Sequence, residues 1–356
     1  MNKLTVAVVF GGQSSEHEVS RTSASTIISN LDPEKYYVIP LGITKNGKWM
    51  IYNGPVENIK NGEWEKFGTP AIISPDASQR GLLKTVGGKV KLIPIDLVFP
   101  VLHGKYGEDG TIQGLFELAR IPYVGNGVLS SSVSMDKVFT KIIAKNAKIS
   151  QAKYVVIRSD ELKKIKAVAS RTEKKLGYPC FVKPANAGSS VGITKAHNKE
   201  ELIKGIELAA EHDDKIVVEE AIVGREIECA VIGNGSDIQA SCVGEIFAAA
   251  EFYDYDAKYN NSDSKTVVPA EVSEEKQNEI RDIAIKVFKA VDGSGLARID
   301  FFVEKDTERV IFNELNTLPG FTPISMYSML WAECGKPMNE LLDQLIDLAL
   351  EKFEDN

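Results

Sequence analysis

Alternating polar side chains near the C-terminus form the clearest candidate chemical site in the sequence. Residues 296–315 alternate as two strands do, with a short polar turn between them, and this pattern predicts a hairpin. Side chains two positions apart share one face of a strand, so Arg298 is expected beside Asp300, and Glu314 beside Asn316. This spacing turns three oxygen-bearing side chains and one guanidinium toward a common space.

Oxygen ligands of this kind are suited to Mg²⁺, which takes one or two carboxylates and completes its octahedron with waters and substrate phosphates. The alternative is a solvated sheet face with ordinary cross-strand ion pairs, which are common and contribute little. The turn at residues 317–322 follows the second strand directly, and its backbone N–H groups are suited to hold a developing oxyanion. Close approach of such a group favours glycine, here Gly320. The presence of this turn favours a metal site over an ordinary solvated sheet face.

A loop of small residues at positions 185–192 is the second candidate element. It follows a short strand that carries Lys183 at its end. Such a loop exposes backbone N–H groups to a phosphate, and the lysine supplies a point charge. The sequence contains no Walker A motif, and a plain hairpin loop remains the alternative.

Two acidic segments follow predicted strands elsewhere in the chain. An apolar strand ends in Glu219 and Glu220, and a turn then leads to Glu226, an arrangement suited to adenine and a ribose hydroxyl. After the first strand, a glycine turn places Glu16 where an open α/β sheet binds ligands, and this carboxylate is suited to an ammonium group. The alternatives are a solvated strand end and, around Glu16, simple capping of the next helix by serine.

The composition is that of a folded chain with no overall attraction to polyanions. The 356 residues include 42 Lys+Arg and 50 Asp+Glu, a net charge of −8, so we expect no nucleic-acid partner. The apolar runs are shorter than the roughly 20 residues that cross a bilayer, and no signal-peptide pattern opens the sequence. We therefore expect no membrane partner and a cytoplasmic location. The four irregularly spaced cysteines indicate neither a zinc site nor a disulfide framework.

The N-terminal part of the chain is expected to form an open α/β sheet. A continuous apolar run at residues 4–10, a turn and a segment with helical spacing indicate a buried strand followed by a helix. Residues 36–43 and 96–102 are expected to be further strands of the same sheet. We expect residues 54–88, whose periodicity is weak, to form an irregular excursion from it.

Two further units follow, which differ in the length of their strands. Short strands and charged helical stretches predict a compact α+β unit, with strands at 154–157, 180–184, 191–195 and 215–219 and helices around 160–176 and 199–211. Longer alternating strands predict a third unit, with strands at 225–232, 238–247, 296–304 and 309–315 and helices at 274–291, 323–334 and 338–352. The aromatic-rich segment 252–263 is expected to be a lid, or else to pack its tyrosines structurally.

In their order along the chain, these elements resemble the ATP-grasp superfamily and, within it, the D-alanine–D-alanine ligases of bacterial cell-wall synthesis. The resemblance covers essentially the whole chain and rests on seven motifs. These are Gly11-Gly12-x-Ser14-x-Glu16-x-Glu18-Val19-Ser20, His103-Gly104-x-x-Gly107-Glu108-Asp109-Gly110, Met135-Asp136-Lys137, Lys183-Pro184 with Gly188-Ser189-Ser190-x-Gly192, Lys258-Tyr259, Arg298-x-Asp300, and Glu314-x-Asn316-Thr317-x-Pro319-Gly320. Each motif alone is weak evidence, whereas all seven in the family's order are strong evidence.

The resemblance implies a three-domain ATP-grasp fold of α/β and α+β type. The expected parts are an N-terminal open α/β sheet domain at residues 1–136, a central small ATP-grasp domain at 137–224, and a C-terminal ATP-grasp domain with the metal site and lid at 225–356. It also implies the activity. ATP phosphorylates the carboxylate of one D-alanine, and the amine of a second attacks the acyl phosphate to give D-alanyl-D-alanine, ADP and phosphate for peptidoglycan.

The same resemblance assigns residues to roles. Two Mg²⁺ ions, or Mn²⁺, would be held by Asp300, Glu314 and Asn316. The nucleotide would be bound by Lys137, Lys183, Glu219, Ala221, Ile222, Glu226 and Lys258. Catalysis would use Glu16 for the first ammonium, Ser189 and Tyr259 in a chain of hydrogen bonds to it, and Arg298 with Gly320 for the oxyanion. Substrate would also contact His103, Ser325 and Met326. Relatives are usually homodimers, which we expect here.

The second substrate is the least determined part of this hypothesis. Lys258-Tyr259 matches the dipeptide-forming type, which favours D-alanine in both positions. Residues 39–44 also resemble D-serine ligases, so a D-alanine–D-serine or D-alanine–D-lactate ligase remains the alternative. A catalytically silent nucleotide-binding protein is a third possibility, and the complete ligand set Asp300, Glu314 and Asn316 argues against it.

Overall fold

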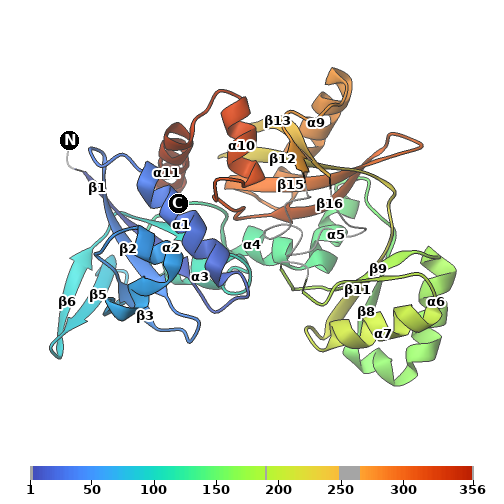
Figure 1. Ribbon diagram of the computed structural model, residues 1–356, viewed down its shortest axis with the longest axis horizontal. Coiled ribbons are helices and arrows are strands. Elements are labelled where there is room, and N and C mark those ends of the chain that lie inside the picture. The colour runs from blue at the N-terminus through green and yellow to red at the C-terminus, as the bar shows by residue number, and fades with distance from the viewer. Residues whose placement is uncertain (1–2, 189–190, 248–264, 355–356) are drawn as a thin grey trace.

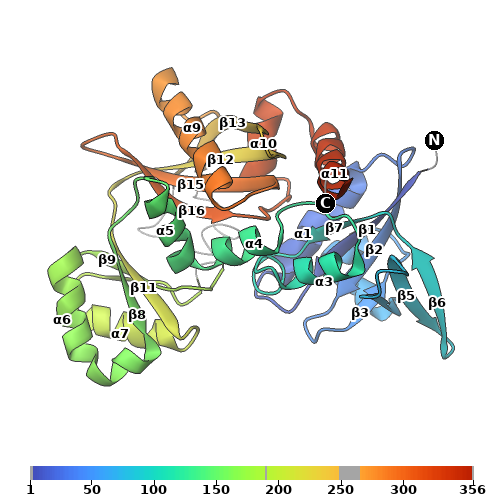
Figure 2. The ribbon, with the colours of Figure 1, turned by 180° about the vertical axis from the view of Figure 1, so that it is seen from behind.

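The computed structural model describes residues 3–188, 191–247 and 265–354. Within these residues the chain forms three β-sheets (Figures 1 and 2). The first sheet lies at one end of the molecule and the second at the other, while the third lies between them and shares a hydrophobic core with the first. Helices α4 (Val128–Met135) and α5 (Lys137–Asn146) lead from the first sheet toward the others.

The first sheet has seven strands in the order β6-β5-β4-β3-β2-β1-β7. They are β1 (Leu4–Gly11), β2 (Tyr36–Ile43), β3 (Trp49–Ile51), β4 (Thr69–Ile73), β5 (Gly81–Val86), β6 (Lys89–Pro94) and β7 (Leu97–Val101). β1 pairs in parallel with β2 and β7, and α1 (His17–Asn30) and α3 (Thr111–Ala119) belong to the same unit. Because β1 is buried on both faces, its apolar run is continuous rather than alternating.

The prediction of an irregular excursion at residues 54–88 is wrong. This stretch holds α2 (Glu57–Asn61), a 3₁₀ turn at Glu63–Lys66, β4 and β5, which extend the sheet by antiparallel pairing. Its periodicity is weak because its elements are short and β5 is only partly buried, with its last two residues exposed. One aromatic anchors the stretch: Trp64 is fully buried, with its ring centroid 4.9 Å from that of Phe10.

The second sheet is antiparallel, with four strands in the order β10-β9-β11-β8. Its elements are β8 (Tyr154–Arg158), a 3₁₀ turn (Ser159–Lys164), α6 (Ile165–Leu176), β9 (Cys180–Pro184), β10 (Thr194–Ala196), α7 (Lys199–Ala210) and β11 (Lys215–Glu220). The compact unit that the sequence predicts is therefore present, with β10 beginning three residues later than expected. Apolar residues of α6 and α7 pack on the sheet in a core of their own.

The third sheet has five strands in the order β14-β13-β12-β15-β16. Its elements are β12 (Gly224–Asn234), β13 (Asp237–Phe247), β14 (Lys265–Val267), α9 (Glu274–Ala290), β15 (Gly295–Glu304), β16 (Val310–Asn316), α10 (Met326–Glu333) and α11 (Met338–Glu354). Helix α9 buries its apolar stripe against β12, β13 and β15, while α10 and α11 join the core under β1 and α1. The long strands and three helices that the sequence predicts are confirmed.

Among the residues described, no helix combines the length and apolarity needed to span a membrane. All four cysteines are free thiols.

Substituting Ile299 tests the strand register on which the site depends. Ile299 is fully buried beneath α9, on the face of β15 opposite the polar side chains. Ile299→Ala is expected to lower the free energy of unfolding by about 2–4 kcal/mol because it leaves a cavity in this core. Urea denaturation measures the loss. Ile72→Ala, at a side chain that is 51% exposed, is the control and should cost less than about 1 kcal/mol. Equal losses would contradict the register.

Candidate active site

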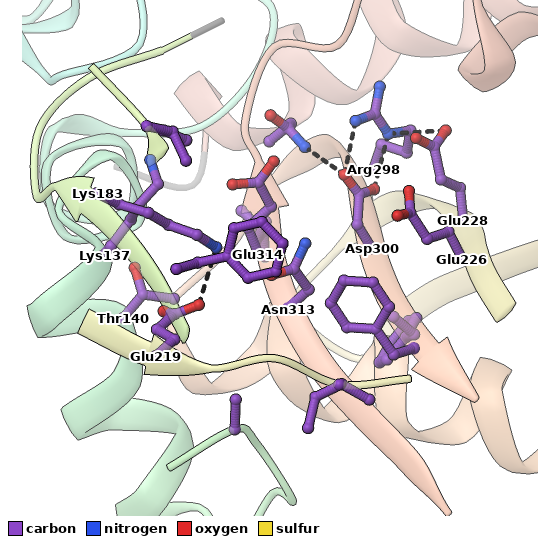
Figure 3. Close-up of a pocket in the computed structure, with 18 of the residues that line it drawn as sticks. Lys137, Thr140, Lys183, Glu219, Glu226, Glu228, Arg298, Asp300, Asn313 and Glu314 are labelled. Atoms are coloured by element: carbon purple, nitrogen blue, oxygen red, sulfur yellow. Dashed lines mark hydrogen bonds and ion pairs between the residues drawn. The ribbon is translucent and has the colours of Figure 1, made fainter. Parts of the chain in front are cut away.

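A cavity of about 460 Å³ lies between the second and third sheets and reaches the first strand's loop (Figure 3). It gathers most of the residues that the sequence singles out. Those in its wall are Glu16, Lys137, Lys183, Glu219, Ala221, Ile222, Glu226, Arg298, Asp300, Glu314 and Asn316. Residues up to 300 positions apart in the chain thus meet around one space.

The β15–β16 hairpin predicted from the sequence is confirmed, and its polar face forms one wall of the cavity. Asp300 pairs with Glu314 on β16 and with Glu228 on β12, so three carboxylates stand in a row across three strands. Arg298 pairs with Asn316 in the neighbouring row. The intervening residues of β15 point into the core, as the alternation predicts.

Arg298 is the cation at the centre of this acidic wall. Its guanidinium binds both oxygens of Asp300, at 2.8 and 2.7 Å, and lies 3.0 Å from the Glu228 carboxylate (Figure 3). Asn316 donates a further hydrogen bond to Asp300 at 3.1 Å. Burial alone would lower the pKa of Arg298, but Asp300 and Glu228 outweigh it and raise the pKa well above its usual value. The guanidinium is therefore permanently charged.

The carboxylates of this wall repel one another. Burial, with the charge of Asp300 and to a smaller extent that of Glu314, raises the pKa of Glu226 to about 6. Within the described residues, no group of three or more His, Cys, Asp or Glu side chains forms a ready-made metal cage. Asp300, Glu314 and Asn316 nevertheless supply two carboxylates and an amide oxygen side by side, which fits an ion that takes its remaining ligands from phosphates. The donor set therefore fits Mg²⁺.

Lysines form the opposite wall of the cavity. The ammonium of Lys183, on β9, lies 2.8 Å from Glu219 of β11, and Lys141 of α5 holds the other oxygen of the same carboxylate at 2.9 Å. Burial alone would raise the pKa of Glu219, but the two lysines outweigh it and lower the pKa to about 2. Lys137 donates a hydrogen bond to the carbonyl of Ala187, in the small-residue loop, at 2.8 Å.

Glu16 enters the cavity from the first sheet through a gap that only glycine leaves open. A Cβ at Gly104 would lie 2.4 Å from the Glu16 carboxylate, and one at Gly188 would lie 2.9 Å from it. Glu16 is the N-cap residue of α1, and no side chain caps this helix with a hydrogen bond. Ser14 instead accepts a hydrogen bond from the Glu16 N–H and donates one to the carbonyl of His103. The serine-capping alternative is therefore not supported.

Thr317 lines the cavity, and the rest of the turn at residues 317–322 lies beside it. His103 holds this turn through the carbonyl of Leu318 at 3.0 Å, and its other ring nitrogen lies 3.2 Å from the hydroxyl of Ser23. Ser325 packs against Gly320, where a Cβ would lie 2.8 Å from its hydroxyl. The predicted substrate residues His103, Ser325 and Met326, and Gly320 itself, are thus neighbours of the cavity and not lining residues.

Three predicted residues cannot be placed in this arrangement. Ser189, Lys258 and Tyr259 lie outside the described residues, as does the whole of the expected lid at 252–263. Their roles remain predictions.

Sequence reasoning assigned no role to three charged residues that the structure brings to the site. These are Glu108, Glu228 and Lys141. Signals were present: Glu108 lies in a quoted glycine-rich motif, Glu228 is two positions after Glu226 on one strand, and Lys141 is one helical turn after Lys137. Such spacing does not reveal burial, and burial is what gives each of them a defined partner.

The Glu108 carboxyl has a raised pKa and two backbone hydrogen-bond partners. It accepts hydrogen bonds from the N–H of Gly104 at 2.7 Å and from the N–H of Leu318 at 3.1 Å, and so joins the first sheet to the turn. Burial, together with the charge of Glu16, raises its pKa to about 8. The carboxyl is therefore largely protonated at neutral pH.

Comparison with known proteins covers the whole length of the chain. The model of the D-Ala-D-Ala ligase N-terminus matches residues 5–126, and that of the D-Ala-D-Ala ligase C-terminus matches residues 143–347. The D-alanine–D-alanine ligase of Ruminiclostridium cellulolyticum is 53% identical, over 100% of this chain and 97% of that protein. The chain belongs to the D-alanine–D-alanine ligase family. A second member, from Acetivibrio thermocellus, is 52% identical over 100% of this chain and 98% of its own length.

Solved structures of the family have the same fold. VanG D-Ala:D-Ser ligase from Enterococcus faecalis superposes with a TM-score of 0.89 at 41% identity, over 98% of this chain and 100% of that one. The D-alanine–D-alanine ligase from Coxiella burnetii gives 0.86 at 35% identity, over 99% and 97%. The predicted ATP-grasp fold is therefore confirmed, and the chain is a member of a family of ATP-dependent ligases.

Replacing Glu108 tests whether its carboxyl is protonated in the folded protein. The unfolded carboxyl titrates near 4.5 and the folded one near 8, so between these values the folded state holds a proton that the unfolded state has lost. As pH rises from 4.5 to 8, the stability of the wild type should fall by more than about 1 kcal/mol relative to that of Glu108→Gln, and the difference should then level off. Denaturation across pH measures it. A constant difference would contradict the raised pKa.

Proposed function

We propose that this protein joins two molecules of D-alanine at the expense of ATP, giving D-alanyl-D-alanine, ADP and phosphate for peptidoglycan synthesis. One observation carries the proposal. A row of carboxylates on β12, β15 and β16 faces a pair of lysines across a single cavity, and Glu16 reaches into the same space. An acidic wall suits a metal ion with its phosphates, a basic wall suits the phosphates themselves, and a separate carboxylate suits an amino acid.

The nucleotide occupies the part of the cavity between β9 and β12 in this proposal. Lys137 and Lys183 supply positive charge to the phosphates, aided by Lys258. Glu219 and the backbone of Ala221 and Ile222 bind the adenine, and Glu226 binds a ribose hydroxyl. The ladder between β11 and β9 ends at Glu220, and the N–H of Ala221 then donates a hydrogen bond to the carbonyl of Pro179 at 3.2 Å. The position of Ala221 and Ile222 in the cavity wall, directly after the strand, supports this assignment.

The metal site lies on the opposite wall. Asp300, Glu314 and Asn316 would hold the Mg²⁺ ions, two in our proposal, with Mn²⁺ as a substitute. When bound, the metal neutralises charge on the phosphate oxygens during transfer. Asp300 is held for this purpose by Arg298 and by the Asn316 amide, which fix its orientation.

The chain's own residues orient the two amino acids. Glu16 binds the ammonium of the first D-alanine, so that its carboxylate points toward the metal wall. Arg298 and the N–H of Gly320 stabilise the oxyanion that forms when the second amine attacks the acyl phosphate. The second carboxylate lies near Ser325 and Met326, and His103 secures the turn that carries them. Tyr259 and Ser189 complete the hydrogen-bond chain to Glu16.

D-alanine is our choice for the second position as well. The relatives that are 52–53% identical are named D-alanine–D-alanine ligases, and Lys258-Tyr259 matches that type. Two observations favour D-serine instead: the likeness to a D-Ala:D-Ser ligase at 41% identity, and the resemblance of residues 39–44 to D-serine ligases. We further propose a cytoplasmic homodimer with domains at residues 1–136, 137–224 and 225–356, whose partners are these small molecules and neither nucleic acid nor membrane.

Phosphate release with different second substrates tests the proposed activity. With ATP and Mg²⁺, D-alanine alone should support rapid release and yield D-alanyl-D-alanine, which mass spectrometry identifies. Addition of D-serine or D-lactate should add a mixed product at less than about one tenth of that rate. Faster turnover with D-serine or D-lactate at neutral pH would replace our choice of second substrate. Absence of any amino-acid-dependent ADP formation would refute the ligase itself.

Glu314→Gln tests the metal role. The amide keeps the shape of the side chain but removes the negative charge that a divalent ion requires, so ADP formation should fall by at least about 100-fold. The melting temperature should stay within about 5 °C, since Glu314 faces the cavity rather than the core. Glu308→Gln, at an exposed position in the turn of the same hairpin, is the matched control. Near-normal turnover of Glu314→Gln would exclude the proposed ligand.

A further inference from the structure

Lys141 is a buried lysine that stands directly behind the nucleotide side of the cavity. It lies on α5, is only 2% exposed, and has its ammonium 5.6 Å from the centroid of the Tyr154 ring. Lys137 and Thr140 of the same helix line the cavity, but Lys141 does not. A buried ammonium is tolerated only where an ion pair offsets its loss of water, and Lys141 has such a partner in Glu219.

The Glu219 carboxylate is divided between two lysines. Its Oε1 lies 2.9 Å from Lys141 and its Oε2 lies 2.8 Å from Lys183. Each lysine has an oxygen of its own, so the two contacts do not compete. The two lysines differ in their access to ligand, because Lys183 and Glu219 line the cavity while Lys141 is sealed beneath them.

This difference in access matters when a nucleotide binds. In the proposed function, on which this inference rests, Lys183 gives its charge to the phosphates. When the Lys183 ammonium turns toward the phosphates, its ion pair with Glu219 is weakened. If Glu219 had no other cation, it would become a buried carboxylate without compensation, a state that is strongly unfavourable. Lys141 remains in contact with Glu219 in either case.

We propose that Lys141 is a positioning residue of the nucleotide site. Lys141 keeps Glu219 ionised and fixes its orientation from the side of Glu219 that faces away from the cavity. Lys183 can then bind the phosphates while Glu219 binds the adenine. Lys141 itself touches neither substrate nor metal. Its effect is on nucleotide binding, and not on the chemistry of the bound complex.

Lys141→Met is the principal test, since it retains the length of the side chain and removes the charge. The dissociation constant of ATP in the presence of Mg²⁺, measured by calorimetry, should rise at least about tenfold. The KM for ATP should rise in parallel, while kcat at saturating ATP and the KM for D-alanine should change less than about threefold. Lys141→Arg, which keeps the charge, should bind ATP within about threefold of the wild type.

A double substitution shows whether Lys141 acts through Glu219. In the Glu219→Gln background the charge that Lys141 balances is absent, so adding Lys141→Met should weaken ATP binding by less than about threefold more. Lys145→Met is the matched control, because Lys145 is exposed one turn further along the same helix, and it should have no effect. If Lys141→Met does not fold, the neutral double variant and Lys141→Arg provide the comparison.

The outcomes separate this inference from the proposed function. Unchanged ATP binding in Lys141→Met, or equal losses in Lys141→Met and Lys141→Arg, would overturn the positioning role. A loss in Lys141→Met of the same size with and without Glu219 would overturn it too. A wild-type protein that binds ATP but forms no D-alanyl-D-alanine would refute the proposed function alone, and one that binds no ATP would refute both.

Discussion

The buried guanidinium of Arg298 is the charge on which the candidate site depends. It is only 6% exposed and binds Asp300 and Glu228, and the carboxylates of Glu226 and Glu314 lie on the same wall. A buried ion pair contributes little net stability, because desolvation offsets most of the attraction. Its value lies in geometry: the guanidinium holds Asp300 at both oxygens and makes an acidic wall tolerable in the folded protein. Removing it would leave uncompensated buried carboxylates, at a cost of about 3–5 kcal/mol.

The turn after β16 connects the wall that carries Arg298 to the first sheet. His103 and Glu108 hold the carbonyl and the N–H of Leu318, and the Phe321 N–H donates to Ser23 of α1. Asn126 adds a second anchor, with its amide donating to the carbonyls of Leu296 and Thr317. These contacts fix one end of the β15–β16 hairpin, where β15 begins and β16 ends, against the first sheet. An amino acid held at Glu16 and a group held at Asp300 therefore sit in one rigid frame rather than on two separate units.

The sequence predicted the parts of this site that follow from local periodicity. A repeat of two places Arg298 with Asp300 whatever surrounds the strand, and an acid after a buried strand is visible at Glu219. The weak repeat of residues 54–88 hid α2, the 3₁₀ turn, β4 and β5, because these short and partly exposed elements bury too little to show a pattern. Glu108 and Lys141 were missed for a different reason. Their properties come from burial against residues 210 and 78 positions away, and no local pattern encodes such contacts.

The two walls of the cavity differ in their balance of charge, and this difference explains how one cavity can accept a polyanion. On the β12–β15–β16 wall, carboxylates outnumber the single guanidinium, so a divalent cation relieves repulsion there. On the opposite wall, Lys137 and Lys183 line the cavity and Glu219 is also paired from behind with the buried Lys141, so a phosphate satisfies the surplus positive charge. Each wall alone attracts one component of a metal–phosphate complex and repels the other. Only a ligand that carries both charges, such as a metal–nucleotide complex, satisfies both walls at once, and this requirement makes the charge pattern selective without any base-specific contact.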